Sequence, residues 1–560
     1  MGKMKFRRIM KLSMDIPEAS LEQAKEQLTA LRRLTAQSAE FGEEVGQVIA
    51  QLRQVAAPFH EPFIFTAVLS ENEKLLRVVF RDCGDIEFRS FYVGRRKALL
   101  TYLEGMTDTT SLEKNIIEKL MTQADQTSIG GQQNLPADMK SIAEQILNAA
   151  AVTVISRASI GIETVMTGNA LLLIDGMAEG LSIGTAEYVR RSISGANNEH
   201  VLQGSNEAFN ETLSDNLVLI RRRARDAEVK IRILQVGKRT QTSIAVLYVA
   251  DLVQVGLVEE VEHRLSMIQK DKIVTSTEIE EFLVDHPWTP FPQTQRTERP
   301  DKMVAALYEG RVGIIVNGTP VSILLPCTYN VLMQITDDYT IQPIIASSIR
   351  LMRNVAAFVA IYLPAIYVAV VSYHPGMLPT SMAITVAELR ARSPFPSFME
   401  AVMMEILLEV FQEAVVRLPK KISGAASMIG ALVIGTTIVQ AGIINPLLVV
   451  VIATTALASY SMPAYNFSMA LRWLRIPILI LASILGLYGV ILGILVVTIH
   501  LCSLRSFGES YIGGLFNVDL FSDWKDALVR FPAPFLQKRP KEFGAQDQTR
   551  VGGHNGKSGS

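Results

Sequence analysis

KISGAASMIGALVIGTTIVQAGIINPLLVVVIATTALASYSMPAYNFSMALR, residues Lys421 to Arg472, is the stretch that decides the fold. Between its two terminal basic residues it contains no Asp, Glu, Lys, Arg or His. About 20 predominantly apolar residues are enough for a helix to cross a bilayer, so this stretch predicts two membrane spans. We expect the break between them at Asn445 and Pro446, because proline lacks a backbone donor and asparagine favours a turn.

Two further apolar runs flank this stretch at a distance. NVAAFVAIYLPAIYVAVVSY (Asn354–Tyr373) predicts one span, with a kink at Pro364 that a membrane helix tolerates better than a soluble one. IPILILASILGLYGVILGILVVTI (Ile476–Ile499) predicts another. A mean hydropathy of +0.25 and 19% charged residues, over 560 residues, are unusual for a soluble protein of this size.

The segment between the first span and the uncharged stretch is predicted to form a helix from Ser397 to Leu418 that carries a stripe of charges. Charged groups at membrane depth usually face a protein interior or a water-filled cavity, so one interpretation is a helix lining a polar cavity or a subunit interface. The alternative is an amphipathic helix on the bilayer surface with its acids in water. The charges are Glu400, Glu405, Glu409, Glu413 and Arg417.

Basic residues in short loops predict the orientation of the spans, but they conflict. Lys420, Lys421, Arg472 and Arg475 suggest cytoplasmic loops on both sides of the uncharged pair of spans. The basic C-terminal tail also looks cytoplasmic, although an odd number of crossings would place it outside. The sequence leaves this conflict open.

The N-terminal half contains short apolar runs that end in turns, and in two of three such units a helix follows. The units are Ala98–Leu120, Asn169–Val189 and Ser243–Leu265. Repeated β-then-α units predict a mixed fold class, with a cytoplasmic α/β N-terminal region of two subdomains and an α-helical multi-span transmembrane domain. The expected parts are a helical extension (1–60), α/β subdomains (61–130 and 131–285), a Pro-rich coupling and pre-membrane region (286–350), a transmembrane domain (351–503) and a cytoplasmic tail (504–560).

The stretch PFPQTQRTERPD (Pro290–Asp301) lies at the junction of the two halves. Its prolines are interpreted as excluding a helix and holding the backbone extended, since a slack linker would more naturally use Gly and Ser. We interpret it as a stiff strut that couples the cytoplasmic region to the membrane part. Its charges, which are offered for ion pairing, are Arg296, Glu298, Arg299 and Asp301.

The composition offers few signs of enzyme chemistry or of nucleic-acid binding. A net charge of −1 gives no general basic surface for nucleic acid. Three cysteines and seven histidines show neither a disulfide framework nor metal-ligand spacing. The acidic pair Asp337 and Asp338 is interpreted as loop surface. We therefore predict no enzyme activity, no catalytic residue, no metal and no cofactor.

Several separate blocks of the sequence together resemble the A subunit of the GerA family of spore germinant receptors. The resemblance runs in order from about Pro62 to Pro540. One departure is that the usual G-P-R-E-G-F-T-E block reads GSNEAFNE from Gly204 here. The blocks are GSNEAFNETLSDNLVLIRRR (Gly204–Arg223), VGKRTQTSIAVLYV (Val236–Val249), PFPQTQRTERPD, GRVGIIVNGTP (Gly310–Pro320) and RSPFPSFMEAVMMEILLEVFQEAVVRLP (Arg392–Pro419).

The resemblance implies a multi-pass subunit of the spore inner membrane with its N-terminal domain in the cytoplasm. It implies a permease-like B subunit and a lipoprotein C subunit as partners, contact with membrane lipids, and no nucleic acid. It further implies that the A subunit forms a homo-oligomer and a ligand-gated channel that releases monovalent cations when nutrients are sensed.

If the chain forms a pore, its wall needs a helix that packs closely with copies of itself and is polar on one side. Gly424–Gly442 is the best candidate. We expect Thr437 and Gln440 to face water and Val433 to form an apolar constriction. The alternative is a small-residue helix that packs inside a helical bundle and lines no pore. The predicted pore face comprises Ala426, Ile429, Val433, Thr436, Thr437 and Gln440.

Two other functions stay open at this point. A transporter would use the Pro-rich segment Ser393–Pro396 as a substrate site, although no pair of inverted repeats is evident. A non-conducting scaffold would relay ligand binding from a partner to another channel.

Overall fold

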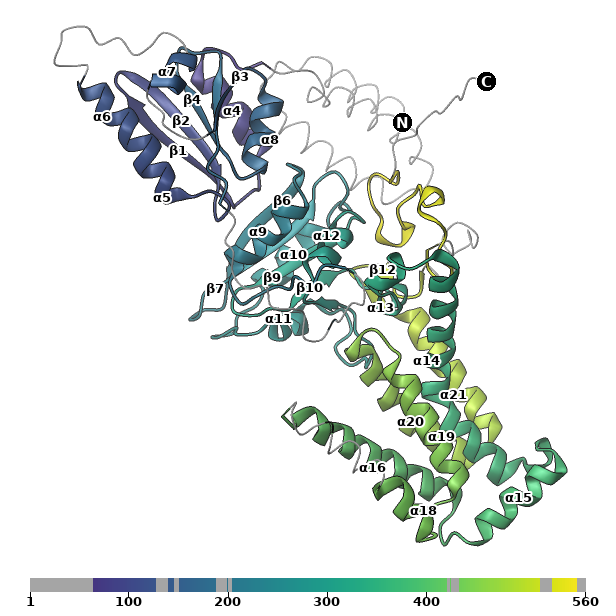
Figure 1. Cartoon of the computed structure of the whole chain (residues 1–560). Coiled ribbons are helices and arrows are strands. Elements are labelled where there is room, and N and C mark those ends of the chain that lie inside the picture. Colours follow the sequence, from purple (N-terminus) through teal and green to yellow (C-terminus); the bar gives the residue numbers. More distant parts are fainter. Residues whose placement is uncertain are drawn as a thin grey trace, which may run out of the picture.

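The computed structural model divides the chain into an α/β half and a helical half (Figure 1). The expected N-terminal extension (1–60) and two of the predicted pore residues, Ala426 and Ile429, lie outside the residues that the structure describes. The described residues are 64–126, 139–145, 151–187, 199, 204–419, 424, 433–513 and 526–550.

The first part of the α/β half is a five-stranded antiparallel sheet between two helical layers. Every residue of its third strand in space is buried, as expected for a sheet covered on both faces. Helices α4 (Leu69–Val79) and α8 (Ala158–Met166) pack on one face, and α5 (Thr109–Leu112), α6 (Glu118–Gln126) and α7 (Met139–Gln145) pack on the other. The strand order is β1 (Ile86–Val93), β2 (Arg96–Leu103), β4 (Ala170–Ile174), β5 (Gly180–Ile183) and β3 (Val152–Ile155).

The second part repeats this topology. A hairpin, an edge strand, a helix and a second hairpin follow one another along the chain in both sheets. Helices α9 (Leu213–Arg223) and α12 (Pro300–Leu307) cover one face, and α10 (Leu257–Ser266) and α11 (Ser276–Leu283) cover the other. The strand order is β6 (Val229–Val236), β7 (Thr242–Val249), β9 (Val312–Val316), β10 (Ser322–Leu325) and β8 (Gln295–Thr297).

The expected repetition is therefore present, but the expected boundaries are wrong. Two of the three predicted units, Ala98–Leu120 and Ser243–Leu265, occupy equivalent places as the second strand of a hairpin followed by a helix, whereas Asn169–Val189 is a hairpin. Strands β3 to β5 belong to the first sheet, although the predicted boundary placed them after residue 130. Strands β8 to β10 belong to the second sheet, not to a coupling region at 286–350. Some antiparallel partners, such as β2 with β4 and β8 with β10, lie far apart in sequence. A local apolar run therefore does not indicate which sheet its strand joins.

A buried joint connects the two sheets. The Gly84 nitrogen donates to the Ile231 carbonyl at 2.8 Å, and the Ile231 nitrogen donates to the Asp82 carbonyl at 2.9 Å. Arg221 of α9 holds Asp85 through two hydrogen bonds of 2.7 and 3.0 Å. These contacts fix the first sheet against the second.

The helical half begins with α14 (Pro343–Tyr373), which contains the predicted span and Pro364. Helix α15 (Thr380–Ala391) and helix α16 (Ser397–Arg417) follow, and α16 matches the predicted charged helix within one residue. The break at Asn445 is confirmed, because its side chain accepts a hydrogen bond from the Leu447 nitrogen and caps α19 (Pro446–Tyr460).

The predicted single span Ile476–Ile499 is wrong. Its residues form an antiparallel hairpin of α20 (Tyr465–Leu485) and α21 (Leu487–Ser503) with a turn at Gly486. Gly486 has a φ of +61°, and a Cβ at Gly489 would lie 2.1 Å from the Leu481 carbonyl oxygen. Glycine thus permits both the turn and the close approach of the two helices. Arg472 and Arg475 consequently lie inside α20, not in the loop expected for them.

The hairpin fixes where the ends of the long helices lie. Tyr373 at the end of α14 contacts Gly486, whereas Phe467 and His500 at the other ends of α20 and α21 contact Phe291 of the α/β half. The tail then returns to the α/β half, where the Gln546 nitrogen donates to the Leu252 carbonyl at 2.9 Å. Helices α14, α20 and α21 therefore each run between the α/β half and the far end of the helical half.

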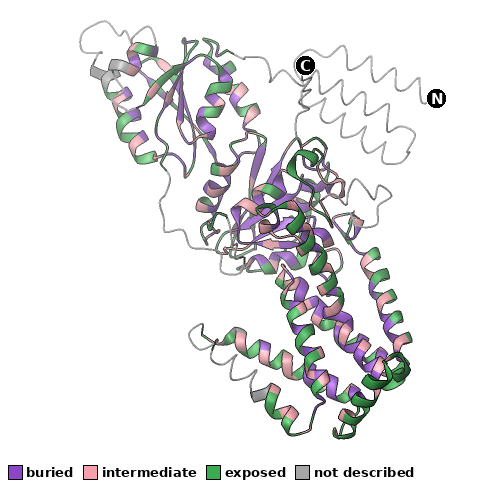
Figure 2. Cartoon of the chain, turned by 45° about the vertical axis from the view of Figure 1, so that its right-hand side comes forward, coloured by how far each residue is buried: buried purple, intermediate pink, exposed green. Residues whose placement is uncertain are grey.

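Helices α14 and α20 are long and apolar enough to cross a membrane, and α19 and α21 are apolar but shorter. The outward faces of the helical half are largely exposed in Figure 2, and its inner faces are buried. These outward faces carry large apolar side chains such as Phe358, Ile484 and Ile491. Such a surface requires a lipid or protein partner.

Candidate functional site

The charged helix α16 places its first two acids inside the helical half. The Glu400 carboxylate accepts hydrogen bonds from the Ser393 hydroxyl and, at 3.2 Å, from the Asn445 nitrogen. The Glu405 carboxylate pairs with Arg475 of α20 at 2.8 Å. The Arg475 Nε donates to the Ala360 carbonyl of α14 at 2.5 Å. One ion pair therefore joins α16, α20 and α14.

The second half of α16 has different surroundings. Glu409 is exposed and lies 3.3 Å from Arg472, and Glu413 is exposed and paired with Arg417 on its own helix. The two ends of the helix therefore differ in burial, and both interpretations of the stripe stay predictions. Its N-terminal acids face the bundle interior, and its C-terminal charges are exposed.

Of the predicted pore segment, the structure describes Gly424 and the backbone from Val433 onward, and the Val433 side chain lies outside the described part. Val433–Thr437 forms a short π-helical turn, η7, which continues as α18 (Ile438–Gln440). Thr436, Thr437 and Gln440 are exposed. A π-helical turn is rare and frequently marks a functional position, but the pore role of this face stays a prediction.

The prediction that PFPQTQRTERPD excludes a helix and is extended throughout is wrong, whereas its coupling role stays a prediction. Gln295–Thr297 forms β8, the edge strand of the second sheet, and pairs with β10 in antiparallel register. Pro300 is the first residue of α12, so the end of the stretch is helical. Proline fits both the edge of a sheet and the first turn of a helix, which is why extended and helical structure coexist here.

The predicted ion pairing of this stretch is present. Arg296 contacts Glu280 of α11 at 2.5 Å. Arg299 is buried and contacts Asp301 at 2.7 Å, and it donates to the Ser205 carbonyl at 3.0 Å. The Glu298 carbonyl accepts a hydrogen bond from the Phe209 nitrogen at 2.8 Å. The stretch therefore fastens the GSNEAFNE block to the second sheet.

A second charged cluster lies where α14 leaves the α/β half. Asp338 accepts hydrogen bonds from Arg350 at 3.1 Å and from the Arg353 Nη1 at 3.0 Å. All three side chains are buried, so the interpretation of Asp338 as loop surface is wrong. The sequence signal was the spacing of two arginines one helical turn apart before an apolar run.

The sequence profile described as "Bacillus/Clostridium GerA spore germination protein" matches residues 74–542. The chain belongs to this GerA family of spore germination proteins. This result confirms the resemblance seen in the sequence.

Relatives of this GerA-family chain include two proteins of Bacillus subtilis (strain 168). Spore germination protein B1 is 36% identical over 86% of this chain and 98% of its own length. The uncharacterized membrane protein YfkQ is 36% identical over 85% of this chain and 91% of its own length. The crystal structure of the N-terminal domain of the A subunit of the Bacillus megaterium spore germinant receptor GerK3 is 27% identical, with a TM-score of 0.38, and covers 47% of this chain and 97% of that chain.

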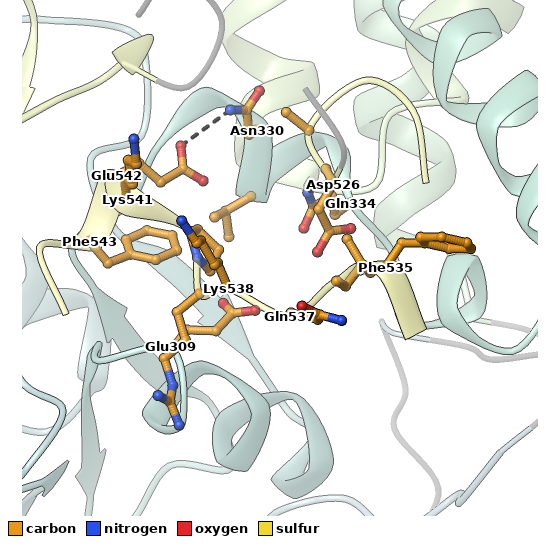
Figure 3. A pocket seen from close by; sticks show the side chains of 15 residues that line it. Glu309, Asn330, Gln334, Asp526, Phe535, Gln537, Lys538, Lys541, Glu542 and Phe543 are labelled. Carbon is orange, nitrogen blue, oxygen red and sulfur yellow. Dashed lines mark hydrogen bonds between the residues drawn. The ribbon is translucent and has the colours of Figure 1, made fainter. Parts of the chain in front are cut away.

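The GerA-family chain has a cavity of about 230 Å³ between its tail and the α/β half (Figure 3). Glu542 of the tail accepts a hydrogen bond from Asn330 of α13 (Tyr329–Met333) at 3.2 Å. Burial raises the pKa of Glu542 to about 7, and the nearby charge of Glu309 acts in the same direction, whereas Asn330 opposes it. The tail contact therefore titrates near neutral pH.

The metal prediction concerns clusters of ligating side chains in the described part of the GerA-family chain. Within those residues no group of three or more His, Cys, Asp or Glu side chains could hold a metal ion. The arrangement is instead one of buried polar contacts that tie helices to one another and the tail to the sheets.

Proposed function

We propose that this GerA-family chain is the A subunit of a nutrient-responsive germination receptor, and that copies of it form a cation channel in the spore inner membrane. Family membership supports the receptor role. The observation that carries the channel role is the set of buried charges in the middle of the helical half, namely Glu400, Glu405 and Arg475. Ionisable residues in such a place mark ion pathways or polar interfaces.

In the proposed topology the described helices α14, α19, α20 and α21 are membrane passes, and both the α/β half and the tail lie in the cytoplasm. Arg350 and Arg353 at the start of α14, together with the basic tail, favour this orientation because cytoplasmic ends carry the excess of positive charge. Helix α19 has 15 residues and would span roughly 22 Å, so it needs a thinned bilayer or neighbouring chains around it.

The proposed gate is the turn around Val433, with Thr437 and Gln440 towards water. Val433→Ser removes an apolar constriction and should raise basal ion leak and cause germination without nutrient. Val450→Ser on α19, an exposed valine outside the gate, is the matched control and should keep the spores dormant. Dormancy unchanged in the Val433 variant would remove this position from the gate.

The proposed partners are the permease-like B subunit and the lipoprotein C subunit. Reconstitution of this chain with both, followed by current measurements with a panel of nutrients, tests the channel. Nutrient-dependent currents far above the turnover of a carrier support it. Absence of current with all subunits present would favour a non-conducting scaffold, and slow saturable flux would favour a transporter.

A further inference from the structure

The loop that precedes β8 exposes a tryptophan almost completely. Trp288 is 97% exposed, the largest exposed fraction among the large apolar side chains of the described residues. An indole ring that can bury some 150–250 Å² gains several kcal/mol when it leaves water. Full exposure of such a ring in a fixed loop therefore points to a partner outside the chain.

The loop holds its shape without Trp288. The Gln293 side-chain oxygen accepts hydrogen bonds from the Asp285 and His286 nitrogens, both at 3.0 Å. The same side chain donates to the His286 carbonyl at 2.6 Å. Pro287 and Pro290 flank the Trp288–Thr289 pair and restrict its backbone. The loop from Asp285 to Gln293 therefore forms a preformed support that holds Trp288 outward.

The support is fastened to the ends of two apolar helices. The Thr289 hydroxyl lies 2.8 Å from the His500 Nε2 in the last turn of α21. Phe291 is buried against His500 and against Phe467 in the first turn of α20. At the end of α21 the exposed apolar residue Ile499 is followed by the polar His500.

We propose that Trp288 lies in the headgroup region of the cytoplasmic leaflet and anchors the second sheet at a fixed height above the bilayer. This inference rests on the proposed membrane function. Tryptophan and tyrosine gather at this depth because the ring is apolar and one edge is polar. Tyr465, the exposed first residue of α20, belongs to the same helix end and would share the layer.

Fluorescence of the full chain in lipid nanodiscs tests the anchor. The chain has three tryptophans, so Trp473→Phe with Trp524→Phe leaves Trp288 as the only one. Its emission is measured with phosphatidylcholine and phosphatidylglycerol lipids brominated near the headgroup or near the end of the acyl chain. We expect blue-shifted emission and a larger loss of fluorescence with the shallow bromine than with the deep one.

The matched control retains Trp473 alone, since this exposed residue lies deeper along α20. Trp288 emission like that of free tryptophan, without quenching, overturns the anchor if Trp473 is quenched. Blue-shifted Trp288 emission without quenching also overturns it, because a protein surface would then cover the ring. Loss of quenching at both positions would instead refute the proposed membrane function itself.

Discussion

Two buried arginine–carboxylate pairs, one in each half of the molecule, differ in how completely their polar atoms are satisfied. In the α/β half, Arg221 donates from Nε and Nη2 to both oxygens of Asp85, and its Nη1 donates to the Val229 carbonyl at 2.9 Å. In the helical half, Arg475 Nη2 and Glu405 Oε1 have no partner among the described residues. Both pairs are buried.

This difference predicts that the Arg221–Asp85 joint is fixed and that the Arg475–Glu405 joint rearranges more readily. A buried charge pair stabilises a single arrangement only when its remaining donors and acceptors are also bonded. Because these two atoms between α16 and α20 are not bonded within the described residues, we expect this pair to stabilise its arrangement less than the Arg221–Asp85 pair does, and to rearrange more readily. In the joint between the two sheets, Arg221 and Asp85 are fully hydrogen-bonded, so we expect this joint to stay fixed.

The largest expected effect comes from breaking the satisfied pair. Asp85→Ala leaves Arg221 buried and unpaired, which should destabilise the α/β half by about 3–5 kcal/mol. The measurement is the thermal unfolding midpoint of the full chain in detergent. The double variant Asp85→Leu with Arg221→Met should recover most of the loss. A single variant as stable as the parent would show that the joint carries no net stability.

The second effect is a pH dependence where the tail meets the α/β half. The packed state raises the pKa of Glu542 from 4.5 to about 7, so it favours the protonated carboxyl. This contribution is fully present below pH 4.5, declines as pH rises, and is lost above about pH 7. Its full size is about 3 kcal/mol at 1.36 kcal/mol per pKa unit.

Hydrogen exchange of residues 526–550 between pH 5 and pH 8, corrected for intrinsic rates, measures this effect. Protection of the tail should fall as pH rises. Glu542→Gln should flatten the profile, and the exposed Glu87→Gln should leave it unchanged. A profile that keeps its slope in the Glu542 variant would assign the titration to another group.

The third effect comes from breaking the incompletely bonded pair of Glu405 and Arg475. Glu405→Gln removes the charge partner of Arg475, and we expect a loss of about 2 kcal/mol, smaller than for Asp85→Ala, because this joint already lacks two bonds. Under the proposed function the same variant should raise basal ion leak. Glu413→Gln, whose pair with Arg417 is exposed, is the control and should change stability by less than about 0.5 kcal/mol. Equal losses of stability in the Glu405 and Glu413 variants would show that the buried pair contributes no more than the exposed one.

The features that the sequence predicted correctly in the helical half depend on neighbouring residues. The start of α16 at Ser397 and the break at Asn445 follow from proline, a capping side chain and charge spacing. The hairpin at Gly486 has no such signal, because the apolar run continues through it and membrane helices also tolerate glycine. Only packing against Tyr373 and Leu481 reveals the turn.

The features that were missed depend on contacts between distant residues. Asp338 looks like loop surface until Arg350 and Arg353 of α14 fold over it. Strand β8 looks like a linker because its flanking prolines are equally typical of an edge strand. Its pairing with β10 is a long-range contact that no local pattern encodes.

The smallest expected effect concerns the stretch first interpreted as a strut. The Arg296 side chain is 34% exposed and pairs at the sheet edge with the buried Glu280. Because Glu280 keeps a hydrogen bond from the Thr294 hydroxyl, Arg296→Ala should cost only about 1 kcal/mol. Arg299→Ala, in the same stretch but at a buried position, should cost more, because the Ser205 carbonyl and Asp301 lose their donor. Unfolding midpoints of the two variants, compared with nutrient response in spores, distinguish the roles. An edge strand predicts that response falls only in proportion to lost stability. If both variants kept full stability and lost the response, the stretch would act as a coupling strut. The rigid part of the molecule would then extend from the second sheet through this stretch.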